Sequence, residues 1–238
     1  MKLYGLILIT GLVSALCIPA QAQMTGTRLG KNANSDDAPA VLALMAECVG
    51  KRSPAYAKRI MTSMPGSNLE RQEIFSNSGD LGMCMDDTKH RLVLGDNIEL
   101  RMSARQFRVQ LALVMARRSL QGKDFASLAD KAKWSPDIYS SDTVGAASSS
   151  AAQLALYEFG DCVLAARPGE AARLIREGHE KSEGEAAMAR LVPILGACLT
   201  EGVRLELTPE LLMAALAEPI YHRATASDQP AGSPREGG

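Results

Sequence analysis

The chain has five cysteines and three histidines, the residue types with the most direct route to metal binding or redox chemistry. No two cysteines have the CxxC spacing of zinc or thiol-redox sites, and no histidine lies in an HxxxH or HxxE pattern. The sequence also lacks a Gly-x-Ser-x-Gly motif and a phosphate-binding loop. It therefore predicts no metal site, no cofactor and no catalytic residue, and it leaves the cysteines to a structural role.

One acidic cluster is a candidate for proton transfer. Glu180, Glu183 and Glu185 follow His179, so a carboxylate lies one helical turn from the imidazole and could bind a metal or act in a carboxylate pair. Gly178 precedes the cluster, as is typical of a junction between helices. Acidic residues at the start of a helix are also favoured by the helix dipole. We therefore interpret the cluster as a solvated turn.

A row of arginines is a second candidate, for binding phosphate groups. Apolar residues between them recur every three or four positions, which is typical of a helix with one buried face. We expect the apolar residues to face inward and the arginines to face solvent. Because the formal net charge is only -1, neither nucleic acid nor anionic lipid is a predicted partner. The arginines are Arg101, Arg105, Arg108, Arg117 and Arg118.

The cysteines mark an internal duplication. Cys48 and Cys84 are 36 positions apart, and so are Cys162 and Cys198. A shift of 114 residues aligns the two pairs, and a shift of 105 aligns the segments that follow, so the first copy carries an insertion of about nine residues, as loops tolerate. The chain is thus two copies of a unit of about 75 residues. The same shifts align Pro54 with Pro168, and Leu81-Gly82-Met83-Cys84 with Leu195-Gly196-Ala197-Cys198.

Residues 1–22 have the layout of a secretory signal peptide, with Lys2, an apolar run and small residues before a cleavage expected after Ala22. A retained membrane anchor is the alternative, although the run is short for a spanning helix. Cleavage removes Cys17 and leaves four cysteines in an oxidising compartment, the periplasm or beyond. Of the three possible pairings, the duplication favours one bridge within each copy; free buried thiols are the alternative. The predicted bridges are Cys48–Cys84 and Cys162–Cys198.

Proline and capping residues predict four helices in each copy. Pro54 and Pro168 begin the second helix, since proline suits a first helical turn. Capping boxes at 67–70 and 182–185 begin the third helix, which should end near the second cysteine. In the second copy this helix contains Pro193, which predicts a kink or an early stop. Short apolar alternations at 91–94 and 203–207 predict brief extended pieces. Ser103 with Gln106, and Thr208 with Pro209, begin the closing helices.

The predicted fold is therefore all-α: two tandem, related four-helix modules, each closed by one disulfide within the module. The boundaries expected are a signal peptide at 1–22, a disordered lead-in at 23–38, module 1 at 39–120, a linker at 121–152, module 2 at 153–223 and a disordered tail at 224–238. Trp134 and Tyr139 lie in the linker, either as an anchor for a partner or, as we favour, packed against the modules.

The chain resembles a group of uncharacterised exported bacterial proteins in four features. These are the repeated Cys-Val, the proline six residues later, the Leu-Gly-x-Cys motif, and a closing helix that is capped by Ser or Thr and has Arg or His-Arg at its end. The proteins of this group carry such a twin-cysteine helical module, often twice. The resemblance covers about 150 residues and implies the module alone, without an activity or site residues.

The sequence favours a non-enzymatic, exported binding or scaffolding protein of the cell envelope, with a protein partner there and no stable membrane insertion once the signal peptide is removed. Duplication creates extended binding surfaces, which supports this hypothesis. The alternative is an envelope hydrolase or other enzyme whose site is assembled from residues distant in sequence. A deep polar pocket with a perturbed carboxylate or histidine would favour the enzyme.

Overall fold

The computed structural model describes residues 38–76, 78–92, 102–128, 133–139, 148–199 and 206–226. Within these ranges the chain forms nine α-helices and two short 3-10 helices and no strand, which confirms the predicted all-α fold. None of these helices combines the length and the apolar character needed to cross a membrane. The predicted signal peptide, and all of the predicted lead-in and tail except Ala38 and residues 224–226, lie outside the described residues.

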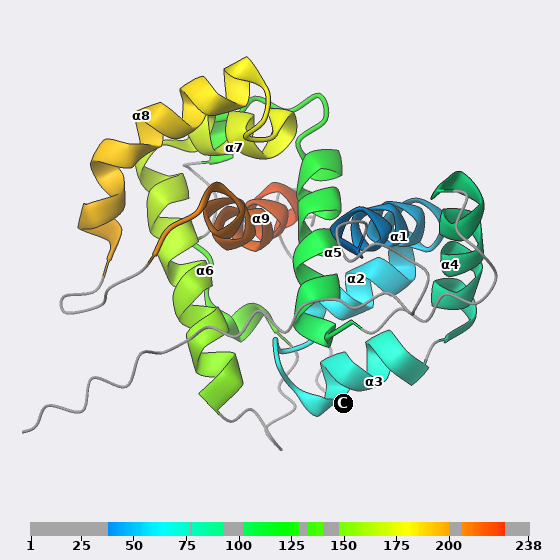
Figure 1. Ribbon diagram of the computed structural model, residues 1–238. Helices are drawn as coiled ribbons and strands as arrows, with labels where there is room; N and C mark the ends of the chain where they lie inside the picture. Colours follow the sequence, from blue (N-terminus) through cyan, green and yellow to red (C-terminus); the bar gives the residue numbers. More distant parts are fainter. Residues whose placement is uncertain are drawn as a thin grey trace, which may run out of the picture.

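The two copies fold into two modules with a similar order of helices, and within the described residues module 1 has five α-helices where four were predicted, while module 2 has the predicted four (Figure 1). Each begins with a long helix, follows it with a short helix that starts at a proline, and ends with a long closing helix. Module 1 contains α1 (Ala38–Arg52), α2 (Pro54–Thr62), α3 (Asn68–Ser76), α4 (Ser78–Leu92) and α5 (Ala104–Ser119). Module 2 contains α6 (Ser148–Ala166), α7 (Pro168–Glu177), α8 (Ser182–Cys198) and α9 (Pro209–Ala226).

The third helix differs between the modules. In module 2 it is the single helix α8, which continues through Pro193 to Cys198, so the alternative of an early stop is wrong, and it is bent along its length (Figure 1). In module 1 the corresponding segment is divided into α3 and α4. Serine, asparagine and glycine at 76–79 have low helix propensity, which explains the division. The extended piece predicted from residue 91 is also wrong at its start, because α4 continues to Leu92. Residues 93–94 and 203–205 lie outside the described residues.

The disulfides join the first helix of each module to the helix that carries its second cysteine. Cys48 of α1 bonds to Cys84 of α4, and Cys162 of α6 bonds to Cys198 of α8. The Cα atoms are 5.6 Å apart in both bridges. The predicted pairing is therefore confirmed. Because disulfides persist in oxidising environments, the two bridges indicate a compartment outside the reducing cytosol.

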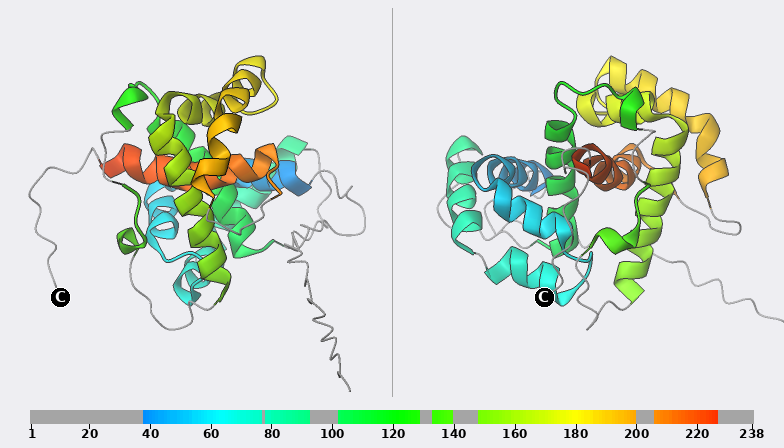
Figure 2. Two further views of the ribbon diagram at one scale, coloured as in Figure 1. Left: turned by 90° about the vertical axis from the view of Figure 1, so that its left-hand side faces the viewer. Right: turned by 180° about the vertical axis from the view of Figure 1, so that it is seen from behind.

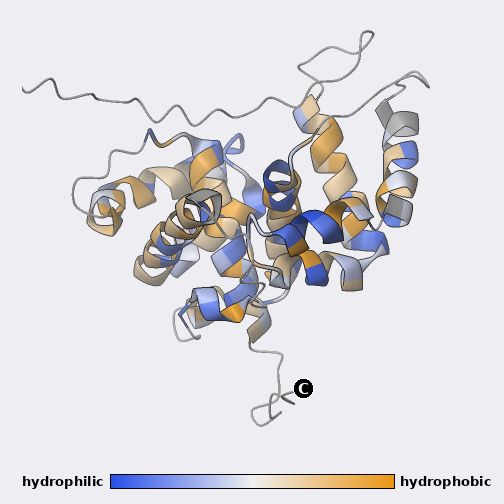
Figure 3. Cartoon of the chain, turned by 90° about the horizontal axis from the view of Figure 1, so that it is seen from below, coloured by the Kyte–Doolittle hydropathy of each residue, from blue (hydrophilic) through white to orange (hydrophobic). Residues whose placement is uncertain are grey.

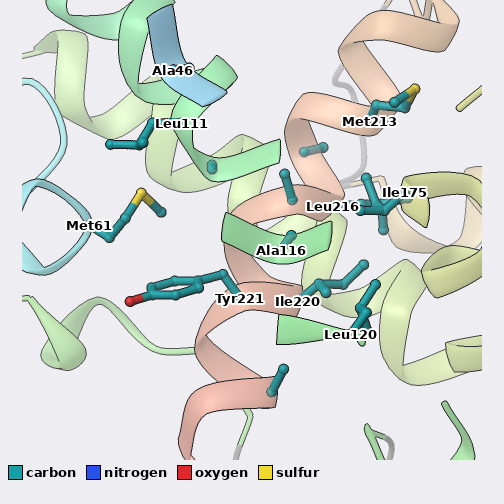
Figure 4. Packing of buried hydrophobic residues seen from close by; sticks show 14 of the residues in the cluster. Ala46, Met61, Leu111, Ala116, Leu120, Ile175, Met213, Leu216, Ile220 and Tyr221 are labelled. Carbon is teal, nitrogen blue, oxygen red and sulfur yellow. The ribbon is translucent and has the colours of Figure 1, made fainter. Parts of the chain in front are cut away.

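The closing helices α5 and α9 pack against each other and join the modules (Figures 1 and 2). Buried residues of both helices belong to one hydrophobic cluster, to which α1, α2, α6 and α7 also contribute. Figure 4 shows Ala116 of α5 near Leu216 and Ile220 of α9 within this cluster, and Leu111 of α5 on the side of Ala46 and Met61. Seen from below, most helices carry both hydrophobic and hydrophilic residues, as expected when one face is buried (Figure 3). The modules thus share a core.

Helices α6 and α9 are in close backbone contact at Gly160. A Cβ atom added to this glycine would lie 1.9 Å from the backbone oxygen of Ala215, a distance that backbone cannot accommodate. The absence of a side chain therefore sets the separation of the two helices. In module 1 the aligned position is occupied by Ala46, which is also fully buried.

The segment between the modules packs against them at its aromatic residues. Trp134 and Tyr139 are 3% and 5% exposed and form a small cluster with Tyr157 of α6. The indole Nε1 of Trp134 donates a hydrogen bond to the hydroxyl of Tyr139 at 3.1 Å. This confirms the packing favoured from the sequence. Helix α6 already begins at Ser148, before the predicted module boundary at residue 153.

Candidate functional site

Arg108 of α5 is the most deeply buried cation of the described residues. The predicted position of Arg108 on the solvent face is wrong, because its side chain is 0% exposed. Arg108 precedes the buried Leu111 and Ala112 by three and four positions, so it lies on their face of the helix. This spacing is the signal by which its burial could have been predicted.

The Arg108 guanidinium is fully engaged in hydrogen bonds. Its Nε and Nη2 donate to the two carboxylate oxygens of Glu218 in α9, at 3.0 and 2.5 Å. Its Nη1 donates to the backbone oxygen of Ile60 at 2.8 Å and to Glu70 of α3 at 3.2 Å, and Nη2 reaches the backbone oxygen of Met61 at 3.2 Å. A bidentate bond of this kind fixes orientation as well as supplying energy. Arg108 therefore ties α2, α3 and α5 of module 1 to α9 of module 2.

Two tyrosines complete this buried network. The Tyr139 hydroxyl donates to Glu218 Oε1 at 2.6 Å, and the Tyr139 ring lies 5.4 Å from the Arg108 guanidinium. The Tyr157 hydroxyl accepts from Gln153 Nε2 at 2.6 Å. Burial, followed by the nearby Glu218 charge, raises the pKa of both tyrosines far above the usual range. Both hydroxyls are therefore neutral and fixed as hydrogen-bond donors or acceptors.

The two carboxylates of the network respond to burial in opposite ways. Burial alone would raise the pKa of Glu218, but the Arg108 charge, the His222 imidazole 3.8 Å away and the hydrogen bonds from Arg108 hold that pKa well below its ordinary value. For Glu70, burial outweighs the Arg108 charge and the hydrogen bond from the Gly66 backbone, so its pKa is raised. Glu218 is thus the permanent counterion of Arg108, and Glu70 is the weaker acid.

A second buried ion pair stabilises module 2. Arg223 of α9 donates from Nε to Asp161 of α6 at 2.7 Å and from Nη1 to the backbone oxygen of Leu128 at 3.2 Å. The backbone nitrogen of Trp134 donates to the same Asp161 oxygen at 3.3 Å. Arg118, which aligns with Arg223, instead donates to the backbone oxygen of Gly50 at the end of α1. Both closing helices are therefore anchored to the first helix of their own module by an equivalent arginine.

The histidine and acidic cluster at the α7–α8 turn does not converge on one point. His179 Nε2 lies 3.2 Å from Glu210 Oε1, and its Nδ1 lies 3.4 Å from the sulfur of Met213, so the imidazole faces α9. Glu180, Glu183 and Glu185 are exposed. Across the described ranges, no group of three potential metal ligands comes together. The side chain of His90 lies outside the described residues.

The remaining arginines of the predicted row do not form a phosphate-binding face. Arg105 is exposed, whereas Arg117 donates to the backbone oxygen of Ile175 at 2.8 Å and Arg118 is engaged with α1. Arg101 lies outside the described residues. The row thus serves mainly to join helices.

A surface hollow of about 420 Å³ lies between α7 and α8 and is lined by three guanidinium groups. Each neighbouring carboxylate is shared by two cations. Glu170 lies 3.6 Å from Arg173 and 2.9 Å from Arg190, and Glu177 lies 2.7 Å from Arg176 and 3.8 Å from Lys181. We call this feature the arginine hollow; its lining residues are Arg173, Arg176, Ser182, Glu183, Ala186 and Arg190.

The start of α8 at the arginine hollow lacks the predicted capping box. The N-cap residue is Lys181, whose side chain makes no capping hydrogen bond, so the first backbone N–H groups of α8 have no side-chain partner. In module 1 the Ser67 hydroxyl does accept from the Glu70 backbone nitrogen at 3.0 Å, while the Glu70 carboxylate bonds to Gly66 instead of Ser67. The box at Ser103 is complete. Sequence pattern alone did not distinguish these outcomes.

A smaller hollow of about 130 Å³ lies beside the first disulfide and is lined by Glu47, Cys48, Lys51, Arg52 and Asp87. Its cations and anions are balanced. Neither this hollow nor the arginine hollow is lined by a residue of the Arg108 network. The buried network is therefore a structural junction between the modules, and the arginine hollow is the candidate binding site.

Comparisons of the chain with protein-family models, with curated proteins and with solved structures found no match. The resemblance to twin-cysteine exported proteins consequently depends on the motif residues themselves.

Proposed function

We propose that the chain is an exported, non-enzymatic binding or scaffolding protein of the cell envelope, located in the periplasm or secreted, with a protein of the envelope as its partner. The pattern of residues 1–22 and the two disulfides support export. In this proposal the arginine hollow contacts an anionic group of the partner.

The observation that carries the proposal is the contrast between two sets of charged side chains. Arg108 and Glu218, two charged groups with strongly perturbed pKa values, are 0% exposed and are engaged in joining the modules. The guanidiniums of the arginine hollow are between 38% and 51% exposed and line a concave surface. The first set supports a rigid framework, and the second set is available to a ligand.

A pull-down from envelope extract with the mature protein tests this role. We expect a stoichiometric partner with the wild type and its loss when Arg173, Arg176 and Arg190 are all changed to alanine. A matched triple variant, Arg52→Ala/Arg59→Ala/Arg71→Ala, removes three exposed arginines from module 1 and should retain the partner. Equal recovery with both triple variants would show that the arginine hollow is not the contact surface, and no recovery with the wild type would contradict the binding role.

A further inference from the structure

The arginine hollow carries more positive charge than its own carboxylates balance. Glu170 is shared by Arg173 and Arg190, and Glu177 is shared by Arg176 and Lys181. Each group of three residues therefore has one positive charge in excess. Glu183, which lines the same hollow, offsets one of these two charges, so the set keeps a single net positive charge. The pKa of Glu177 is lowered by its hydrogen bond from Arg176, so it stays ionised and the count holds at neutral pH.

The donors of the hollow approach from several directions. Arg173 and Arg176 project from α7, and Arg190 projects from α8. The Ser182 hydroxyl lies at the start of α8, a helix of 17 residues whose first N–H groups lack a side-chain cap. The positive end of the helix dipole adds to the attraction for an anion. A carboxylate has two oxygens in one plane, whereas a phosphate monoester has three terminal oxygens in a tetrahedral arrangement and suits converging donors better.

One of the arginines is held in place before any ligand arrives. The guanidinium of Arg176 lies 4.9 Å from the centre of the Phe125 ring, and its Nε donates to Glu177 at 2.7 Å. Such a group loses little side-chain freedom on binding, which favours affinity. The hollow of about 420 Å³ is open to solvent, so the organic part of a monoester can extend out of it.

We propose that the anionic group bound by the arginine hollow is a doubly charged phosphate monoester. This inference rests on the proposed binding function and specifies the chemistry of its ligand. Glu183 also lines the hollow and opposes an anion, while Glu180 and Glu185 are exposed near it. The charge on Glu183 therefore provides a variant with the opposite expected effect.

Isothermal titration of the mature protein with glycerol phosphate at neutral pH and low salt tests the proposal. We expect saturable binding that weakens by about fivefold or more in Arg176→Ala and in Arg173→Ala/Arg190→Ala, and that tightens by about twofold in Glu183→Gln, because charge-assisted bonds are lost or a repulsion is removed. Arg59→Ala, an exposed arginine paired with Glu73 in module 1, is the matched control and should bind within about twofold of the wild type. Circular dichroism confirms that each variant is folded.

Parallel titrations with inorganic phosphate and with succinate separate the sources of charge. Binding of both phosphates indicates recognition of the phosphoryl group itself, and binding of the monoester alone indicates that the attached group contributes; either supports the proposal. No saturable binding of the monoester, equal binding of succinate, or identical affinity in Arg176→Ala would overturn it. If the monoester fails while the pull-down still depends on the hollow, the ligand class is wrong and the binding function stands.

Discussion

Arg108 and Glu218 lie in different copies of the duplicated unit and form a bidentate ion pair, with both side chains 0% exposed. Burying two charges costs several kcal/mol per ion, and the geometry offsets that cost because each polar atom has a partner. The pair therefore contributes little to the net free energy of unfolding, and its main effect is to specify how the two modules pack against each other. Removing one member alone leaves the other charge buried without its partner, so the effects of the two single replacements should not add.

The first prediction concerns single and double replacement of this pair. Arg108→Met leaves Glu218 buried without its counterion and should lower the free energy of unfolding by about 3–5 kcal/mol. The double variant Arg108→Met/Glu218→Leu should lose less than the sum of the two single losses, because neither charge is then left buried alone. It still removes the Arg108 partner of Glu70 and the Glu218 partner of the Tyr139 hydroxyl. Urea unfolding followed by circular dichroism measures both, and Arg59→Ala should change stability by less than about 1 kcal/mol. Additive losses in the double variant would contradict the coupling.

The second prediction is a dependence of stability on pH that differs for the two carboxylates. The pKa of Glu218 is lowered in the folded state, so its contribution is present above the unfolded pKa and is lost as the pH falls below it. Wild type should therefore lose more stability than Glu218→Gln between about pH 5 and pH 3.

For Glu70 the sign is reversed, because its folded pKa is raised. Its contribution is fully present below the unfolded pKa and is lost as the pH rises through the folded pKa. The stability of Glu70→Gln relative to wild type should therefore increase from about pH 4 toward neutrality. Denaturation midpoints measured across this range test both signs, and a parallel pH dependence in the two variants would show that the assignment is wrong.

The third prediction concerns the disulfides. Each closes a loop between cysteines separated by 36 positions, for which chain entropy gives about 4 kcal/mol of stabilisation. Replacing both cysteines of one bridge with alanine should lower the free energy of unfolding by about that amount. The two variants are Cys48→Ala/Cys84→Ala and Cys162→Ala/Cys198→Ala. Non-reducing mass spectrometry of peptides from the wild type should recover the two bridges within the modules. A peptide linking one module to the other would contradict the structure.

The fourth prediction tests the close approach of α6 and α9. Gly160→Ala places a methyl group against the backbone at Ala215 and should cost about 1–3 kcal/mol by forcing the helices apart. Gly196→Ala in α8 is the matched control, because nothing lies within 4 Å of its added Cβ. That change should be neutral or stabilise by up to about 1 kcal/mol through helix propensity. The midpoint temperature of thermal unfolding should therefore fall for Gly160→Ala and should stay unchanged or rise for Gly196→Ala.

The fifth prediction uses the single tryptophan of the chain as a probe. Trp134 is 3% exposed and bonds to Tyr139, whose hydroxyl also reaches Glu218. Its fluorescence should be that of a buried indole. Tyr139→Phe removes both hydrogen bonds and should cost about 1–3 kcal/mol, with a red shift of the emission. An unchanged spectrum and stability would show that the segment is not packed as described.

The sequence allowed the helical modules and their bridges to be predicted because both follow from local pattern and from the repeat. The apolar spacing of α1 placed Val41, Leu42, Met45 and Val49 on one face, and all four are buried. A duplicated pair of cysteines restricted the pairing without any three-dimensional information. These features depend on residues close in sequence or on comparison of the copies.

The buried network could not be predicted in the same way. Arg108 and Glu218 are 110 positions apart, and their pairing depends on how α5 crosses α9. A carboxylate among the apolar residues of α9 was a signal that Glu218 is buried, but nothing in the sequence indicated which cation is its partner. The arginine hollow likewise depends on the packing of α8 against α7, which brings Arg190 to Glu170. Contacts of this kind are set by tertiary geometry and not by spacing.

When the two copies are aligned, the position of Arg108 in module 1 corresponds to Met213 in module 2, and the position of Glu218 in module 2 corresponds to Leu113 in module 1. The ion pair consequently has no symmetric equivalent, and two identical halves placed together would oppose a buried guanidinium with a leucine. Like-with-like assembly is penalised by this mismatch, so residues 38–139 and 148–226 expressed as separate polypeptides should recombine as a heterodimer in preference to either homodimer.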